Sequence, residues 1–440
     1  MAEHKNRPRV VIVGGGFGGL HAAQALRRAE VDVTLVDRSN YHLFQPLLYQ
    51  VATGALSPAN IASPLRSILR RQRNTVVLQA EATGFDLSGQ RLLLADGQLP
   101  YDYLVVAAGA THSHFGHDEW EPLAPGLKTI DHATEIRARV LSAFERAERA
   151  TDPDEQQRLL SFVIVGGGPT GVELAGALSE LSRHTLRHEF RRVSPESARI
   201  HLVDAAPCVL SNYPQDLSDK ARGFLERLDV TVHPHTLVTG ITPHGVTLKR
   251  DDTETDLPAA TVLWAAGVKA SPLAKKLADA AGGETDRAGR ISVNDDLSLP
   301  DFDNVLVIGD MARVLDDNDA PLPGVAPVAI QQGKYVARAI RNRIAGAVTK
   351  PFRYRDRGSM ATVGRSAAVV DLGRFKFAGF FAWLCWLFLH LMLLVSFQNR
   401  ILVLVQWMWS YVTHGRAARL ITGRRPDAEQ GADAAKPNGA

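Results

Sequence analysis

Two glycine-rich segments have the residue types and the spacing that bind the pyrophosphate of a dinucleotide. The glycines of the first segment are Gly14, Gly15, Gly16 and Gly19. In this pattern one glycine allows a tight turn, another lets the backbone approach the pyrophosphate, and the last lets helix and strand pack closely. The following helix, expected over residues 20–28, then directs free N–H groups at the phosphate. A second apolar run ends at Asp37, whose carboxylate can accept a hydrogen bond from a ribose hydroxyl.

The same arrangement occurs again later in the chain. Its glycines are Gly166, Gly168 and Gly171. Glu173 follows the last glycine, and the second strand, expected over 199–203, ends at Asp204 after a basic helical extension expected over 182–197. Two alanines follow Asp204, with no Arg or Lys beside them to bind a 2′-phosphate, so the segment is predicted to bind NADH rather than NADPH. The alternative is that Asp204 is a solvated acid at the end of a strand.

A second repeated motif indicates that whole domains are duplicated. Apolar runs end in Ala-Ala-Gly at Gly109 and again at Gly267, each well after its own glycine segment. The interval between the two glycine segments, from Gly14 to Gly166, is too long for the repeat of a solenoid. It indicates two copies of one nucleotide-binding domain. Alternating apolar strands and amphipathic helices over residues 1–345 predict parallel α/β sheets that position both segments. Two dinucleotide sites in one chain imply a flavin and a nicotinamide.

Asp310 indicates which copy binds which cofactor. It follows a strand expected over 304–308, after the second copy has closed. In flavoproteins with two dinucleotide sites, such a Gly-Asp returns to the first domain and bonds the ribityl chain of FAD. We therefore expect FAD in the first domain and NADH in an inserted second domain, unless Asp310 only caps a helix. A helix that starts near Pro327 would direct its N-terminus at the flavin and stabilise the negative charge of the reduced ring.

Several segments together resemble the bacterial type II NADH:quinone oxidoreductases. They are residues 40–52 (NYHLFQPLLYQVA), the motifs VGGGPTGVE and VIGDMA, a helix of the form AxxAxQQG, and a Trp-rich C-terminal segment. The resemblance covers residues 8–425. It implies that two electrons pass from NADH to FAD and then to a membrane quinone, ubiquinone or menaquinone, without proton pumping.

The resemblance also implies roles for single residues. The expected FAD contacts are Gly14, Gly16, Gly19, Asp37, Gly109 and Asp310, with the backbone of Ala329 under the flavin edge. The residues expected on the NADH side are Gly166, Gly168, Gly171, Glu173, Asp204 and Gly267. The expected catalytic residues are Glu173, beside the nicotinamide–flavin stack, and Gln331. The alternatives are that Glu173 is an acid favoured by the helix dipole and that Gln331 is an ordinary polar position. Pro327 replaces the first glutamine of the family helix, which departs from the family pattern at an expected quinone contact.

The C-terminal region is expected to meet the membrane. Residues 377–399 contain no Asp, Glu, Lys or Arg, and residues 401–413 form a second apolar stretch with Trp and Tyr. About 20 apolar residues suffice to cross a bilayer, so one transmembrane span is an alternative. Aromatic residues beside basic ones favour a helix that lies in the interface, and a buried or dimer-forming helix is the third alternative. The basic residues expected to face anionic headgroups are Arg374, Lys376, Arg400, Arg416 and Arg419.

Composition narrows the class of protein. The 440 residues include 50 Lys and Arg against 47 Asp and Glu, a formal net charge of +3, which argues against a nucleic-acid partner. Cys208 and Cys385 are too far apart in sequence for a dithiol or zinc motif, which argues against dithiol flavoprotein reductases, sulfide:quinone oxidoreductases and a metal site. A reductase of the ferredoxin-reductase type and a redox-sensing protein that binds FAD and NADH remain alternatives. The N-terminus lacks the apolar region of a signal peptide, so the cytoplasmic face of the cell membrane is expected.

The resulting prediction is an α/β protein with two Rossmann-like domains, the NADH domain inserted in the FAD domain, and a C-terminal membrane-associating helical segment. The expected boundaries are 1–125 and 286–345 for the FAD domain, 126–285 for the NADH domain, 346–425 for the membrane region, and 426–440 for a disordered tail. A homodimer is a further expectation. Lipid contact is expected through residues 377–413.

Overall fold

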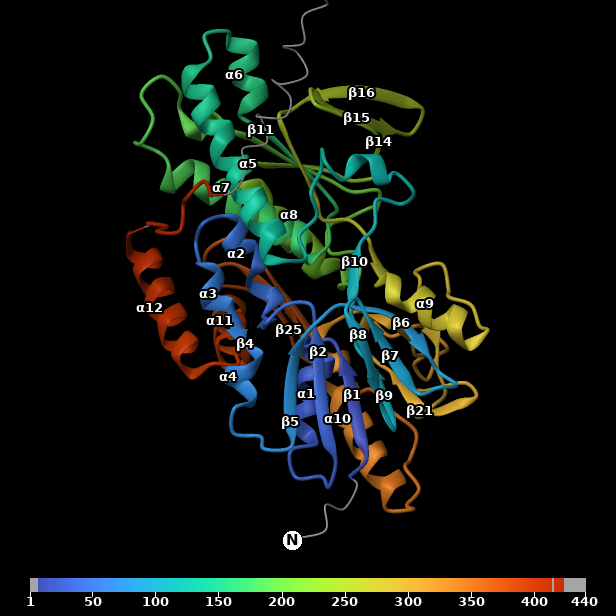
Figure 1. Ribbon diagram of the computed structural model, residues 1–440. Coiled ribbons are helices and arrows are strands. Elements are labelled where there is room, and N and C mark those ends of the chain that lie inside the picture. The colour runs from blue at the N-terminus through green and yellow to red at the C-terminus, as the bar shows by residue number, and fades with distance from the viewer. Residues whose placement is uncertain (1–6, 414, 423–440) are drawn as a thin grey trace, which may run out of the picture. The chain divides into compact units, whose positions relative to one another are not determined.

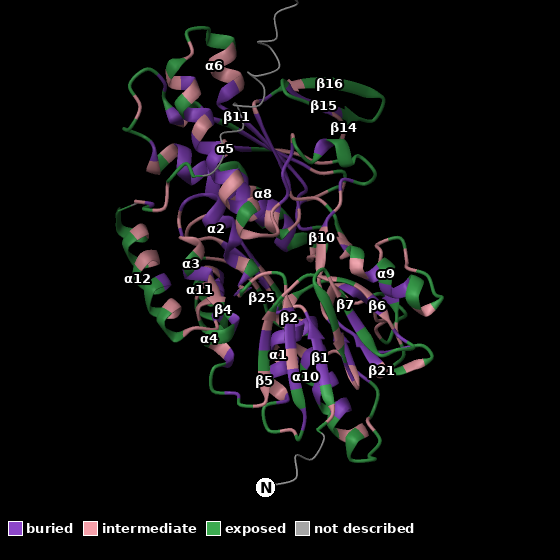
Figure 2. Ribbon diagram, in the orientation of Figure 1, coloured by how far each residue is buried: buried purple, intermediate pink, exposed green. Residues whose placement is uncertain are grey.

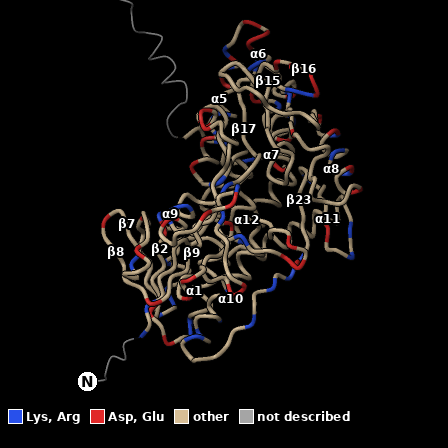
Figure 3. The backbone as a smooth tube through the Cα atoms, turned by 90° about the vertical axis from the view of Figure 1, so that its right-hand side faces the viewer, with Lys and Arg blue, Asp and Glu red and all other residues tan. Residues whose placement is uncertain are grey.

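The computed structural model describes residues 7–413 and 415–422 of the chain, which form two compact α/β units (Figure 1). Unit 1 consists of Met1–Leu43, Ala62–Thr111 and Val268–Arg357. Unit 2 consists of Phe44–Ile61, His112–Gly267 and Gly358–Ala440. The tail expected to be disordered, 426–440, lies outside the described residues. Charged residues are distributed over both units (Figure 3).

Unit 1 is built on a six-stranded sheet with the order β20-β21-β9-β1-β2-β5. Its strands are β20 (Ser298–Leu299), β21 (Phe302–Val307), β9 (Tyr103–Val106), β1 (Arg9–Val13), β2 (Asp32–Asp37) and β5 (Thr75–Gln79). All neighbouring strands are parallel except β20 and β21. The inner strands are nearly continuous runs of Val, Ile and Leu because helices or loops cover both faces of a parallel sheet. Val10, Ile12, Leu104 and Leu306 are fully buried in it.

The strand β21 joins this sheet although most of the chain's middle section separates it from β9. Val305 lies opposite Leu104 and Val307 lies opposite Val106 in a parallel register. The chain therefore leaves the first sheet, builds the second nucleotide-binding fold, and returns. This confirms the predicted insertion of one domain in the other.

Two helices of unit 1, α1 (Phe17–Ala25) and α10 (Ala326–Ile344), pack against each other on one face of this sheet (Figure 1). Gly333 lies so close to α1 that a Cβ atom there would be 2.2 Å from the carbonyl oxygen of Gly18. The α1 helix was expected over 20–28, but it starts and ends three residues earlier. It ends early because the side-chain amide of Asn74 binds the carbonyls of Leu26, Ala29 and Val31, which replaces helix hydrogen bonds.

The remaining elements of unit 1 are small. They are β3 (Tyr41–Leu43), β4 (Ala62–Pro64), α4 (Leu65–Leu69), β6 (Ala82–Asp86), β7 (Arg91–Leu94), β8 (Gly97–Pro100), β18 (Val268–Ala270), α9 (Pro272–Ala281), β19 (Ile291–Ser292) and β22 (Ala312–Arg313). The strands β6, β7 and β8 form an antiparallel sheet. The short strand β10 (Ala110–His112) lies where the chain passes from unit 1 to unit 2.

Unit 2 contains a parallel sheet with the order β13-β12-β11-β17. Its strands are β11 (Ser161–Val165), β12 (Arg199–Val203), β13 (Val230–His233) and β17 (Thr261–Trp264). Its main helices are α5 (Ile130–Arg149), α6 (Pro153–Leu159), α7 (Pro169–Glu180) and α8 (Gln215–Arg227). An antiparallel sheet of β14 (Leu237–Thr242), β15 (Gly245–Arg250) and β16 (Thr253–Pro258) follows.

The helical extension predicted over 182–197 is wrong. Only a π-helical turn, Leu181–Thr185, and a 3₁₀ turn, Pro195–Ser197, are present there. The carboxylate of Glu148 accepts hydrogen bonds from the backbone N–H groups of three successive residues between these turns, Arg191, Arg192 and Val193. These donors are satisfied without a helix, so the basic segment takes an irregular path.

The last part of unit 2 begins with an antiparallel sheet of β23 (Ser359–Thr362), β24 (Ala368–Asp371) and β25 (Lys376–Gly379). The helices α11 (Phe380–Leu393) and α12 (Phe397–Thr413) follow. The uncharged run 377–399 is therefore divided between a strand and two helices. Within the described part of the chain, we find no helix with the length and apolar character needed to cross a bilayer.

The helices α11 and α12 leave most of their apolar side chains exposed (Figure 2). Only Ala382, Trp386 and His390 of α11 are buried, a stripe at four-residue spacing, and only Val403 of α12. Within α11 and α12, the most exposed large apolar side chains are Val412 78%, Phe381 76%, Phe397 72%, Trp409 67% and Phe388 65%. Contiguous apolar surface of this kind marks a site of contact with a membrane or another protein.

Candidate active site

The glycines of the first segment have the geometry that a dinucleotide loop requires. Gly14 follows β1 with a φ of +101°, and a Cβ atom there would lie 2.3 Å from the carbonyl oxygen of Ala107. A Cβ atom on Gly19 would lie 1.9 Å from the carbonyl oxygen of Gly14, so strand and helix approach too closely for any side chain. Gly16 is the N-cap of α1, and a Cβ atom there would meet no described atom within 4 Å. The open side of Gly16 fits a pyrophosphate that approaches the helix N-terminus.

The second segment repeats this geometry in unit 2. Gly166 follows β11 with a φ of +111°. A Cβ atom on Gly171 would lie 1.8 Å from the carbonyl oxygen of Gly166. Gly168 is the N-cap of α7, and a Cβ atom there would again point into space that no described atom fills. Each unit therefore offers one loop that fits a dinucleotide.

The two strand-end acids hold their own loops in shape. Oδ2 of Asp37 accepts a hydrogen bond from the N–H of Gly15 at 2.6 Å, and Oδ1 accepts one from the N–H of Ser39 at 2.6 Å. Burial raises the pKa of Asp37, although these two donors oppose the shift. Asp204 accepts hydrogen bonds in the same way, from the N–H of Gly167 and, at 2.7 Å, from that of Ala206. The acids expected to bind ribose thus also fix the glycine turns.

The return strand brings Asp310 and the start of α10 together in unit 1. Asp310 lies in a 3₁₀ turn, Gly309–Met311, in which Gly309 has a φ of +72°. A Cβ atom on Gly309 would be 3.7 Å from the Cβ of Ala329, in the first turn of α10. Gly324 gives Asp310 room, since a Cβ atom there would be 3.2 Å from its Oδ1. The turn that carries Asp310 therefore lies beside the first turn of α10, which carries Ala329.

Gln332 fixes this turn, and the sequence did not single it out. It is 1% exposed, and its Oε1 accepts a hydrogen bond from the N–H of Gly309 at 2.6 Å. The neighbouring Gln331 was expected to be catalytic. Its Nε2 donates to the carbonyl oxygen of Arg355 at 2.9 Å, and its Oε1 accepts from the N–H of Arg355 at 3.0 Å. Adjacent residues on a helix point in different directions, so Gln331 and Gln332 bind different segments. The Gln-Gln pair in the sequence was the signal that could have indicated this.

Gly109 and Gly267 have matching positions and conformations. Their φ angles are +69° and +70°, so each Ala-Ala-Gly ends in a left-handed turn that favours glycine. Beside the first turn, the N–H of Ala108 contacts the sulfur of Met311 at 3.2 Å, which links this segment to the return strand. A Cβ atom on Gly267 would lie 2.4 Å from the ring of Phe115.

Glu173 lies on α7 in an environment that changes its chemistry. Burial raises its pKa to about 8, although the backbone N–H of Thr362 in β23 donates to its carboxyl group. The charge of Glu173 raises the pKa of two tyrosines of unit 2, Tyr49 and Tyr213. Burial and the Glu173 charge both raise the pKa of Tyr49 well above its usual value, so Tyr49 stays protonated. The Glu173 carboxyl group therefore keeps its proton to a higher pH than an ordinary glutamate.

A chain of hydrogen bonds connects this region to α12. The indole N–H of Trp407 donates to Oε1 of Gln50 at 2.8 Å. Nε2 of Gln50 donates to the hydroxyl oxygen of Tyr49 at 3.0 Å. Tyr49 and Gln50 lie on α2 (Leu48–Ala52), inside the segment 40–52 that carried the resemblance. The sequence pointed to this segment but not to these two side chains.

Comparison with protein families and curated proteins gives three principal findings. The family model described as pyridine nucleotide-disulphide oxidoreductase matches residues 8–333, and the NDH2 C-terminal domain matches residues 357–416. The type II NADH:quinone oxidoreductase Ndh of Mycobacterium tuberculosis is 48% identical, and the match covers 96% of this chain and 92% of that protein. The chain belongs to the type II NADH:quinone oxidoreductase family.

Solved structures support the same fold at lower sequence identity. The structure of NDH2 from Plasmodium falciparum in complex with NADH has a TM-score of 0.86 at 20% identity, covering 93% of this chain and 99% of that one. The sulfide:quinone oxidoreductase of Aquifex aeolicus has a TM-score of 0.69 at 18% identity, covering 93% and 92%. Both therefore share the fold of this type II NADH:quinone oxidoreductase.

The C-terminal domain of this type II NADH:quinone oxidoreductase is held on α7 by a buried ion pair. Arg416 Nη2 lies 3.1 Å from Glu180 Oε2, and their side chains are 6% and 11% exposed. Arg416 also donates to the carbonyl oxygen of Thr53 at 3.1 Å, and the N–H of Arg365 donates to Glu180. The prediction that Arg416 faces lipid headgroups is therefore wrong, because a buried carboxylate holds it inside unit 2.

Two other predicted headgroup contacts, Arg400 and Arg419, are half-buried and have partners within the protein. Arg419 pairs with Glu189, and Nε of Arg400 donates to the carbonyl oxygen of Leu394 at 2.8 Å. Arg374 and Lys376 are exposed, as expected.

His390 is buried, and its Nδ1 lies 2.8 Å from the carbonyl oxygen of Trp386, so this ring nitrogen has a hydrogen-bond partner within its own helix. Burial lowers the pKa of His390 to about 4, so it is neutral at pH 7.

Proposed function

We propose that this chain binds FAD at its first glycine loop and NADH at its second, and that it reduces a membrane quinone with the electrons of NADH without pumping protons. The observation that carries the assignment is the parallel pairing of β21 with β9. This pairing brings Asp310 to the sheet that holds the first loop. That loop therefore has, in Asp310, a second group beside it that could contact a flavin.

The fit to FAD rests on residues of unit 1. Gly14, Gly16 and Gly19 with the N-terminus of α1 hold the pyrophosphate, Asp37 and Asp310 accept hydroxyl hydrogen bonds, and the turn at Gly109 leaves the backbone open. FAD bound by these residues would supply the two-electron chemistry that links NADH oxidation to quinone reduction. The first turn of α10 at Ala329 supplies partial positive charge toward bound anionic groups.

NADH binding rests on the second loop. Gly166, Gly168 and Gly171 with α7 hold its pyrophosphate, Asp204 favours the 2′-hydroxyl, and Gly267 provides the open turn. A 2′-phosphate would meet the Asp204 carboxylate and be repelled.

Glu173 balances the protons of the reaction. Oxidation of NADH to NAD⁺ yields two electrons and one proton, whereas reduction of a quinone to a quinol takes up two electrons and two protons. One further proton must come from solvent. Glu173 holds a proton at neutral pH because its pKa is about 8. The hydrogen bonds from Trp407 to Gln50 and from Gln50 to Tyr49 fix the side chain of Tyr49, whose pKa responds to the charge of Glu173, and Gln331 acts in positioning the segment at Arg355.

Membrane attachment rests on the exposed apolar side chains of α11 and α12. They favour a peripheral position on the membrane, where ubiquinone or menaquinone is reached from the bilayer. The face that we propose is the cytoplasmic one, where NADH is formed. Homodimer formation would cover the same surface. The functional domains assigned are 1–125 with 286–345 for FAD, 126–285 for NADH and 346–425 for the membrane.

The test is NADH oxidation with a water-soluble quinone and, in parallel, with NADPH. We expect a yellow protein that NADH bleaches without oxygen, quinone reduction with NADH, and much slower turnover with NADPH. Bleaching without quinone reduction would instead support a redox-sensing protein. Reduction of ferredoxin in preference to quinone would support the ferredoxin-reductase alternative.

A further inference from the structure

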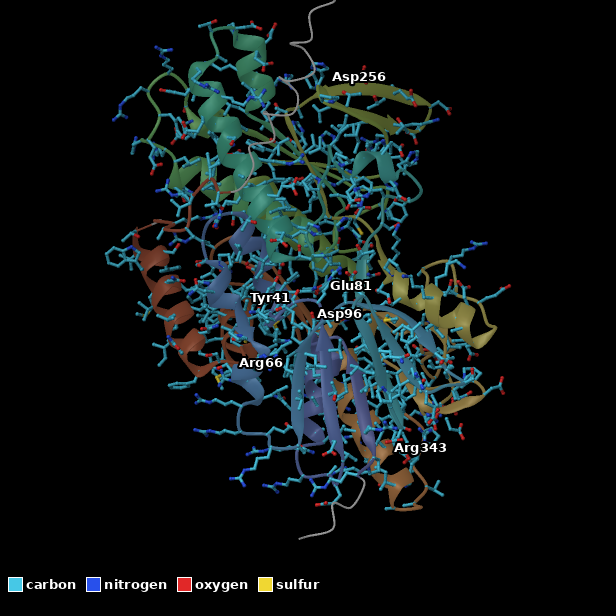
Figure 4. The ribbon with its side chains drawn as sticks, in the orientation of Figure 1. Tyr41, Arg66, Glu81, Asp96, Asp256 and Arg343 are labelled. Carbon is cyan, nitrogen blue, oxygen red and sulfur yellow. The ribbon has the colours of Figure 1, made fainter. Side chains whose placement is uncertain are left out.

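Six exposed arginines gather at one place in unit 1. They are Arg27, Arg28, Arg66, Arg70, Arg71 and Arg73, which we call the arginine surface. Arg66 lies on α4 (Figure 4), and Arg70, Arg71 and Arg73 follow in the connection to β5. Arg27 and Arg28 follow the end of α1.

Two amide side chains bring these segments together. Gln72 is 6% exposed, and its Nε2 donates to the carbonyl oxygen of Ala23 at 2.7 Å. Asn74 donates to the carbonyl oxygens of Leu26 at 3.1 Å and Ala29 at 3.2 Å, and Val33 donates to the carbonyl of Asn74 at 2.8 Å. The connection to β5 therefore lies along the end of α1. Because the glutamine and the asparagine point inward, the arginines between and beside them point outward.

The arginines of this surface differ from those elsewhere in the chain. Arg9 pairs with Asp102 at 3.0 Å, Arg290 with Asp286 at 2.8 Å, and Arg343, on α10 (Figure 4), with Asp296 at 2.5 Å. Among the residues that the structure describes, none of the six arginines of the surface has such a carboxylate partner. Of the acids in the same stretch, Glu30 is already paired with Arg7 at 2.9 Å.

Local structure does not explain this concentration of charge. Basic residues near the end of a helix can stabilise its free carbonyls. Here the amides of Gln72 and Asn74 already occupy those carbonyls, and Arg70, Arg71 and Arg73 belong to another segment. Like charges held together repel each other, so a bound anionic partner would relieve a cost that the free protein carries.

We propose that the arginine surface binds anionic phospholipid headgroups, as a membrane contact separate from the apolar helices α11 and α12. Guanidinium groups bind phosphate oxygens in a bidentate way, and the surface contains arginine without lysine. Its side chains are exposed rather than gathered around a cavity, which suits a layer of many phosphates better than one soluble ligand. The choice of lipid rests on the membrane attachment proposed above, because an enzyme held at a bilayer meets headgroups continuously.

The test compares vesicle binding of the full-length, FAD-loaded protein with two triple variants. The first, Arg70→Gln with Arg71→Gln and Arg73→Gln, removes charge from the surface. The control, Lys249→Gln with Arg250→Gln and Arg287→Gln, removes the same charge from exposed positions elsewhere. Vesicles are either pure phosphatidylcholine or contain about one third phosphatidylglycerol. Each basic residue near such a surface contributes roughly fivefold to affinity, so the first variant should bind the anionic vesicles at least about tenfold more weakly.

We expect the wild type and the control to prefer anionic vesicles, the first variant to lose most of this preference, and all three to bind neutral vesicles equally. A triple Arg→Lys variant at positions 70, 71 and 73 should retain most of the binding, which separates loss of charge from misfolding. An unchanged preference in the first variant, an equal loss in the control, or tighter binding to a short DNA duplex than to anionic vesicles would overturn the proposal. Failure of every protein to bind neutral vesicles would count against the apolar anchor instead, because only the ratio between the two vesicle types reports on the arginine surface.

Discussion

Asp204 and Asp37 each serve two purposes with one carboxylate. Both accept hydrogen bonds from a glycine N–H of their own loop and from the N–H two residues further on. A carboxylate so engaged still has lone pairs for a ribose hydroxyl. Substitutions of these acids therefore affect loop shape as well as ligand recognition.

The first prediction concerns the choice between NADH and NADPH. Asp204→Arg should lower kcat/KM for NADH and raise it for NADPH, changing their ratio at least about tenfold, because a repulsive charge becomes an attractive one. Asp204→Asn, which keeps an oxygen to accept from Gly167, is the matched control and should bind NADH more weakly without gaining NADPH activity. Parallel steady-state kinetics with both nucleotides give the ratio. An unchanged ratio in the arginine variant would remove Asp204 from the recognition site.

The second prediction concerns Glu173 and pH. Its pKa is raised from 4.5 to about 8, so the folded protein binds a proton that the unfolded chain has released. This contribution to stability is complete below about pH 4.5 and is lost as the pH rises through about 8. Glu173→Gln should therefore flatten the fall of Tm with pH across this window, as thermal unfolding at several pH values would measure.

The same variant separates two roles in turnover. We expect Glu173→Gln to retain anaerobic bleaching by NADH, because hydride transfer needs no protein acid or base. Quinone turnover should become slower and lose its decline above about pH 8. Complete loss of bleaching in a folded, FAD-loaded variant would assign Glu173 to the NADH reaction instead.

At the scale of secondary-structure elements, α12 reaches the Glu173 region through one indole. Trp407→Phe would leave Oε1 of Gln50 without its donor, a loss worth about 1–3 kcal/mol for a buried group. We expect lower quinone turnover with an unchanged rate of flavin bleaching. Trp409→Phe, an exposed aromatic two residues away, is the control. Equal effects from both variants would show that the helix contributes bulk apolar surface rather than this hydrogen bond.

A further prediction separates the two functions of the C-terminal elements. Removal of everything after Arg374 would leave Glu180 buried without Arg416, and breaking a buried pair in this way costs about 3–5 kcal/mol. Truncation is therefore expected to destabilise the protein in addition to releasing it from the membrane. Replacing Phe381, Phe388 and Val412 by Gln should abolish binding to neutral phosphatidylcholine liposomes and long-tailed quinone turnover in them, with soluble-quinone activity retained. Persistent sedimentation of this triple variant with neutral liposomes would place the apolar anchor elsewhere.

At the scale of the whole molecule, the residues proposed to bind FAD come from separate stretches of unit 1 that unit 2 interrupts. Ligand that binds only the folded state stabilises it by about 4 kcal/mol at 1,000 times its dissociation constant. The apoprotein should therefore unfold at a lower temperature, and added FAD should restore Tm. Flavin mononucleotide, which lacks the pyrophosphate, should restore it less. Equal restoration by both would contradict binding of the pyrophosphate at Gly16.

Patterns that repeat over short distances in the sequence predicted much of this architecture. The glycine spacing and the strand-end acids reflect requirements of the local backbone, which residue type alone reveals. The Gly-Asp at Asp310 is likewise a short local motif. The insertion of one domain in the other follows from the order of these motifs. The apolar character of residues 377–413 likewise follows from composition.

Only the tertiary structure decided how side chains far apart in sequence affect each other. The pKa of Glu173 depends on burial beside β23, and the partner of Gln331 is the backbone of Arg355. Arg416 looked like a headgroup contact but lies against Glu180, and the run 377–399 divides into a strand and two helices. Burial, long-range pairing and the direction in which a side chain points are set by the packing of distant segments. A linear pattern does not contain that information.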